Sequence, residues 1–124
     1  MTNPEKTVVA VLSDLMFRVK IQEAAKRAGL ESMFVESSAD ALTAAKAGPA
    51  VIIFDLNYPG AAPLETIAAL KADETTRGIQ LIGFVPHVQV DLRQMAEDKG
   101  CDLVVARSAF SQNLPALLER YVEK

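Results

Sequence analysis

Two acidic side chains follow apolar runs of the kind that form buried strands. Asp55 comes directly after Val-Ile-Ile-Phe, and Asp14 is separated by Ser13 from the run at 7–12. Carboxylates leaving buried strands emerge at the sheet edge, and two at one edge suit Mg²⁺, which needs only one or two protein carboxylates. Each also has a simpler interpretation: Asp14 as the N-cap of a following helix, and Asp55 as a cap for loop amides.

The later apolar runs are also followed by polar residues. His87 comes after the run at 79–85, and Arg107 and Ser108 come after the run at 103–106. His87 could shuttle a proton, but a lone histidine that opens a helix is more often a solvated or capping residue. Cys101 lies in a turn before the last run, and we interpret it as an inert thiol.

Several catalytic and cofactor motifs are missing from the sequence. There is no Gly-x-Ser-x-Gly elbow, no Gly-x-Gly-x-x-Gly turn and no Walker loop, and no Cys and His residues have metal-ligand spacing. These absences argue against a hydrolase triad, a nucleotide site and a zinc site. We therefore expect the chain not to be an enzyme.

The elements that must position these residues alternate along the chain. Continuous apolar runs, typical of strands covered on both faces, lie at 7–12, 32–35, 50–54, 79–85 and 103–106. Segments with a helical period lie at 17–28, 37–46, 64–71, 92–100 and 114–122, the last with Pro115 in its first turn. Right-handed crossovers then predict an α/β fold, a three-layer α/β/α sandwich around a five-stranded parallel sheet in order 2-1-3-4-5. In such a sheet, ligands bind beyond the carboxyl ends of the strands.

Length and composition narrow the class of protein. The 124 residues are 50% hydrophobic and 23% charged, which predicts one domain over 1–124. The net charge of −3, without a basic run, argues against direct nucleic-acid binding. No apolar run approaches the ~20 residues that span a bilayer, so we expect no membrane contact. A single cysteine and the lack of a signal segment fit a cytoplasmic location.

Three short segments carry a resemblance to a known family. They are Asp55-Leu-Asn-Tyr-Pro59, the loop at 72–79 and the turn Lys99-Gly-Cys-Asp102. With them, the chain from Val8 to Val122 resembles a response-regulator receiver domain of the CheY type, which has a flavodoxin-like fold.

The resemblance implies a role in a two-component phosphorelay. Asp55 would accept a phosphoryl group from the phosphohistidine of a histidine kinase, with Mg²⁺ held by Asp14, Asp55 and the backbone carbonyl of Asn57. Phosphorylation would alter the face formed by 92–100, 103–106 and 114–122, and so change binding of an output partner. The resemblance leaves room for a homodimer.

The sequence departs from the family pattern at three places. Ser13 stands where receivers have a second acid, so we expect weak Mg²⁺ binding. Val85, followed by Pro86, replaces the switch hydroxyl, and Arg107 replaces a lysine as the phosphoryl contact. These changes indicate a divergent receiver or pseudo-receiver that acts through protein-protein interaction. The alternatives are a normally phosphorylated receiver and a small-molecule-binding or enzymatic domain of flavodoxin-like fold.

Overall fold

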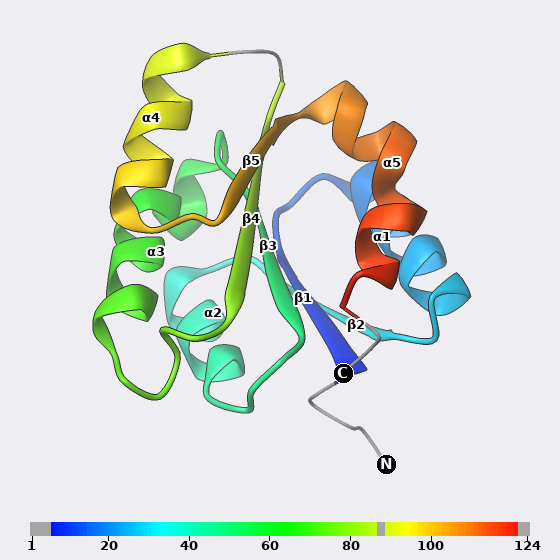
Figure 1. Cartoon of the computed structure of the whole chain (residues 1–124), viewed down its shortest axis with the longest axis horizontal. Coiled ribbons are helices and arrows are strands. Elements are labelled where there is room, and N and C mark those ends of the chain that lie inside the picture. Colours follow the sequence, from blue (N-terminus) through cyan, green and yellow to red (C-terminus); the bar gives the residue numbers. More distant parts are fainter. Residues whose placement is uncertain (1–5, 87–88, 122–124) are drawn as a thin grey trace.

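Strands and helices alternate along the chain in the computed structural model, which describes residues 6–86 and 89–121 (Figure 1). The elements are β1 (Thr7–Val11), α1 (Leu15–Arg27), β2 (Glu31–Val35), α2 (Ser38–Ala45), β3 (Val51–Asp55), the 3-10 helix η2 (Pro59–Ala61), α3 (Pro63–Ala72), β4 (Gln80–Val85), α4 (Val90–Lys99), β5 (Leu103–Ala106) and α5 (Arg107–Glu119). His87 lies outside the described residues. Within those ranges, no helix is both long and apolar enough to cross a membrane.

The strands form one parallel sheet in the order β2-β1-β3-β4-β5, as predicted. In its register, Val11 lies beside Phe54, and Asp55 lies beside Phe84. Because all strands run the same way, their carboxyl ends meet at one edge. We call this the carboxyl edge of the sheet.

Helices cover both faces of the sheet, with α1 and α5 on one side and α2, α3 and α4 on the other (Figure 1). Alternate residues of each strand point to opposite helical layers: Val8 and Ala10 pack with α1 and α5, and Val9 and Val11 pack with α2 and α3. Within the apolar runs, residues 8–12, 51–54 and 81–84 form the centre of the sheet and are buried throughout. The three-layer sandwich is therefore confirmed.

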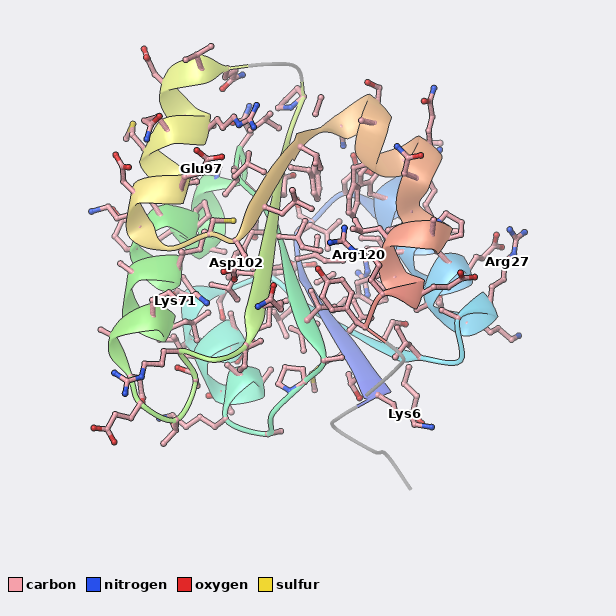
Figure 2. The ribbon with its side chains drawn as sticks, viewed as in Figure 1. Lys6, Arg27, Lys71, Glu97, Asp102 and Arg120 are labelled. Atoms are coloured by element: carbon pink, nitrogen blue, oxygen red, sulfur yellow. The ribbon has the colours of Figure 1, made fainter. Side chains whose placement is uncertain are left out.

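The end of α3 is tied to β4 and β5 by one lysine. Lys71 Nζ donates to the carbonyls of Arg77 and Ile79, each at 3.0 Å, and to Asp102 Oδ2 at 3.1 Å. The same Asp102 oxygen accepts the N–H of Leu81 at 2.9 Å. Figure 2 shows Lys71 reaching from α3 toward Asp102 just ahead of β5. We call this arrangement the Lys71 clasp.

The predicted start of the last helix was wrong. A helix at 114–122 with Pro115 in its first turn was expected, whereas α5 begins at Arg107 and contains Pro115 in its interior. Proline has no N–H to donate to the carbonyl of Ser111, four residues earlier, and so normally disfavours this position. The helix extends through it because Phe110, only 1% exposed, belongs to the same buried face as Leu114. Burial of that face outweighs the lost hydrogen bond.

Candidate functional site

Asp55 is the last residue of β3 and lies half-buried at the carboxyl edge. Its Oδ1 accepts the N–H of Asn57 at 3.0 Å, and its carbonyl accepts the N–H of Tyr58 at 3.1 Å. The capping interpretation of Asp55 is thus confirmed. Burial raises the pKa of this carboxyl, against the opposing effects of the Asn57 hydrogen bond and the positive charge of Arg107, while the nearby charge of Asp14 adds to the rise.

Asp14 is the N-cap of α1, which confirms its simpler interpretation. Its Oδ1 accepts the N–H groups of Met16 at 2.9 Å and Phe17 at 3.2 Å. Its Oδ2 accepts a charge-assisted hydrogen bond from Nη2 of Arg107. Both carboxylate oxygens of Asp14 therefore have protein partners, one in its own helix and one in a different element.

Arg107 is the first residue of α5 and follows β5 directly. Besides its pair with Asp14, its guanidinium carbon lies 4.6 Å from the ring centroid of Phe17 and 6.0 Å from that of Phe84. A guanidinium over an aromatic ring is attracted by the negative face of the ring. The head group of Arg107 is thus held by a carboxylate and by aromatic rings together.

The rings below Arg107 form an aromatic platform of Phe17, Phe84 and Phe110. Phe17 and Phe84 have centroids 4.9 Å apart, and Phe84 stacks on Phe110 at 5.0 Å. The sequence places Phe17 at the start of a helical segment, at 17–28, but does not predict this platform. A signal was available, because Phe17 and Phe110 each lie three residues after a candidate site residue, Asp14 and Arg107.

The loop after Asp55 is held by Tyr58. Its hydroxyl donates to the carbonyl of Glu36 at 2.8 Å, and its ring occupies the space above Gly60, where an added Cβ would meet ring atoms at 2.6 Å. Gly60 therefore permits the close approach of the ring. Asn57, whose carbonyl is a predicted metal ligand, is exposed in this loop.

Val85 ends β4 and is buried at 2% exposure on the α3 and α4 side of the sheet. Just before it, Gly83 leaves space for Leu56: a Cβ at Gly83 would come within 2.7 Å of the Leu56 side chain. The end of β4 is thus packed with apolar groups. It offers no side-chain hydroxyl that could follow a group added to Asp55.

The predicted metal ligands do not form a ready cation site as they are placed. Both oxygens of Asp14 and one of Asp55 accept hydrogen bonds from protein donors. In the part of the chain that the structure describes, no three His, Cys, Asp or Glu side chains gather closely enough to hold a metal ion. A divalent cation here would have to exchange with Arg107 or use the remaining oxygens of Asp55 and Asn57.

A shallow hollow lies beside the loop that follows β3. It is lined by Leu56, Asn57, Pro59, Ala62, Pro63, Leu64 and Glu65. This lining includes Asn57 but none of Asp14, Asp55 and Arg107. The hollow therefore gives the acidic residues no enclosing pocket of the kind that a small-molecule substrate requires.

No protein-family model and no curated protein matches the chain in sequence. Solved structures match it closely in backbone. A response regulator from Hahella chejuensis superposes with a TM-score of 0.84 at 21% identity, with 94% of each chain covered. CheY4 of Vibrio cholerae gives 0.80 at 20% identity, with 93% of this chain and 97% of that one covered.

A third similar structure is the receiver domain of the sensor histidine kinase PA1611 from Pseudomonas aeruginosa, with magnesium in its active-site cleft. It gives a TM-score of 0.80 at 16% identity and covers 94% of this chain and 97% of that one. Identities at this level establish architecture rather than activity. The chain has the CheY-like fold of response-regulator receiver domains.

Proposed function

We propose that residues 1–124 form a receiver-like signalling domain of a two-component pathway, which acts through protein-protein contacts. The observation that carries the proposal is the convergence of Asp55, Asp14 and Arg107 from the ends of β3, β1 and β5 at one edge. The similarity of the backbone to receiver domains supports it. A histidine kinase or another signalling protein is the proposed partner.

Asp55 is the proposed phosphoacceptor. Its carboxylate oxygen would attack the phosphorus of a phosphohistidine, so that a P–O bond forms as the P–N bond breaks and the imidazole leaves. Arg107, whose charge lowers the pKa of Asp55, would offset the added negative charge through a charge-assisted contact. Mg²⁺, if bound weakly by Asp14, Asp55 and the Asn57 carbonyl, would supply further charge neutralisation.

The usual reporting step is proposed to be missing. A modification shifts a conformational equilibrium only through contacts that differ between the two states. Val85 is buried among apolar side chains and has no hydroxyl to contact a phosphoryl oxygen. We therefore expect the face formed by α4, β5 and α5 to bind its output partner, or a second copy of the chain, independently of phosphorylation.

Exposed apolar side chains near the carboxyl edge support a role in protein contact. Leu15 and Met16, which directly follow Asp14, are 70% and 72% exposed, and Val90 at the start of α4 is 70% exposed. Large apolar groups gathered at a surface are typical of interaction sites. Leu15 and Met16 begin the helix that follows β1, and Val90 begins the helix that follows β4, so all three lie on the side of the sheet at which the strands end.

Intact mass after incubation with acetyl phosphate and Mg²⁺ tests the phosphoacceptor. The wild type is expected to gain one phosphoryl group, and Asp55→Asn is expected to gain none. Asp98→Asn, which removes an exposed carboxylate on α4, serves as the matched control and should still be modified. A wild type that stays unmodified, or Asp55→Asn modified to the same extent, would overturn the assignment of Asp55.

A further inference from the structure

The carboxyl edge already contains a positive charge of its own. Arg107 Nη2 donates to Oδ2 of Asp14, while Oδ1 of the same carboxylate accepts the N–H groups of Met16 and Phe17. A metal ion at Asp14 would therefore compete with groups of this chain. The amides are fixed by α1, so the exchangeable partner is the guanidinium of Arg107.

Several restraints hold the guanidinium in this position. The backbone of Arg107 opens α5, its head group lies over Phe17, and its side chain is only 36% exposed in the pair with Asp14 at 35%. A partly buried and preorganised pair is screened less by water than a flexible surface pair. Opening it requires the loss of both the carboxylate contact and the contact with the ring.

We propose that Arg107 is a built-in competitor of divalent cations for Asp14. A metal ion uses Asp14 only when the guanidinium leaves, because Arg107 occupies Oδ2 and repels a second positive charge. In the resting state the guanidinium thus offsets the charge of one of the two carboxylates at the edge. The proposal deepens the proposed function at the same site, but it holds whether or not Asp55 is phosphorylated.

This competition is a different cause of weak metal binding from the absence of an acid at position 13. Ser13 is exposed at the edge, and a carboxylate there would add one attractive charge. Removal of the Arg107 charge instead frees the carboxylate of Asp14, a metal ligand that is already present. The two causes are separable because the second acts only through Asp14.

Calorimetric titration with Mg²⁺, repeated with Mn²⁺, tests the competition. Arg107→Gln is expected to bind about tenfold more tightly than the wild type. The matched control is Arg18→Gln: Arg18 also stacks on a phenylalanine, with its guanidinium carbon 5.0 Å from the Phe34 centroid, but pairs with Glu36 instead. It removes the same net charge and should bind within about twofold of the wild type.

The double variant Arg107→Gln, Asp14→Asn is expected to lose the gain, which assigns it to Asp14. Equal affinities of Arg107→Gln and Arg18→Gln would overturn the proposal, as would a gain that persists without Asp14. Tighter binding in Ser13→Asp together with unchanged binding in Arg107→Gln would also contradict it. If Arg107→Gln does not fold, Arg107→Met, which removes the charge but keeps an apolar stem, is expected to show the same gain, and an unchanged affinity there would overturn the competition. Failure of Asp55 to gain a phosphoryl group would affect none of these outcomes.

Discussion

Two pairs of opposite charges in this molecule differ in what surrounds them. In the Lys71 clasp, Lys71 donates to two carbonyls and to Asp102, and the same oxygen of Asp102 accepts the N–H of Leu81. In the Asp14–Arg107 pair, the guanidinium meets one carboxylate and the rings of the aromatic platform. In the first pair, both charged groups also make hydrogen bonds to the backbone. In the second pair, the guanidinium of Arg107 contacts only side chains among the residues that the structure describes.

The comparison separates a structural role from a functional one. The acceptors of Lys71 belong to the connection between α3 and β4 and to the turn before β5, so the clasp fixes the path of the chain. The positive charge of Arg107 also lowers the pKa of Asp55, so that carboxylate is an alternative electrostatic partner for Arg107. A charged side chain that has an alternative partner can change partners without local unfolding. We infer that only the Asp14–Arg107 pair can exchange in this way.

Loss of the Lys71 clasp should have the largest effect on stability. Lys71→Met keeps the length of the side chain but leaves the carbonyls of Arg77 and Ile79 and the carboxylate of Asp102 without their common donor. We expect a loss of about 2 to 3 kcal/mol in the free energy of unfolding, measured by urea denaturation.

Arg107→Gln provides the direct contrast. Because its pair is one-third exposed and involves no backbone carbonyl, the expected loss is about 1 kcal/mol. If Arg107→Gln destabilised the protein as much as Lys71→Met, the distinction between a structural and an exchangeable pair would be wrong.

A hydroxyl at the end of β4 should have an intermediate effect. Val85→Thr changes shape little but buries a hydroxyl among apolar side chains, which is expected to cost about 1 to 2 kcal/mol in urea denaturation. Leu56, which follows β3, packs on Gly83 of β4 and keeps the surroundings of Val85 apolar. An unchanged stability would mean that the threonine finds a partner at the edge, contrary to the packing described for Val85.

The sheet order and the identity of each element were predictable because apolar runs and helical periods depend on neighbouring residues. Ser37, the first residue of the predicted segment at 37–46, shows this for a helix end, since its Oγ accepts the N–H of Asp40, three residues later, at 3.1 Å. For Asp14, the sequence allowed two interpretations, an N-cap and a metal ligand. Its pair with Arg107 joins residues 93 positions apart, and no local pattern encodes such a contact. The prediction of where α5 begins was wrong for the same reason, because Phe110 is buried by tertiary packing and not by a local sequence pattern.

Removal of the charge at Asp55 should slightly stabilise the protein. Burial raises the pKa of this carboxyl, so the folded state binds its proton more readily than the unfolded state. Stability linked to this group therefore falls as the pH rises through the carboxyl range, and the ionised form costs free energy at neutral pH. Asp55→Asn retains an oxygen that can accept the Asn57 N–H. Its unfolding midpoint at pH 7 is expected to rise by roughly 2 °C, and less at acidic pH. A lower midpoint at pH 7 would contradict this sign.

Cys101, beside the clasp, should have the smallest effect at neutral pH. Burial raises its pKa to about 11, so the thiol stays protonated in the folded state up to alkaline pH. Its contribution to stability is unchanged near pH 7 and falls only as the pH rises above the ordinary thiol value of about 8.5. Alkylation by iodoacetamide at pH 8 should be at least about a hundredfold slower in native protein than in urea. Equal rates would show that the region around the clasp opens readily.

Amide NMR spectra with and without beryllofluoride and Mg²⁺ test most directly the claim that Asp55 is an acceptor without a working switch. The account predicts chemical-shift changes confined to the loop after Asp55 and to the surroundings of Arg107, with α4 and the body of α5 unchanged. Asp55→Asn should remove those changes. Widespread shifts through α4, β5 and α5 would contradict the missing switch, and a spectrum without any change would contradict the acceptor role of Asp55.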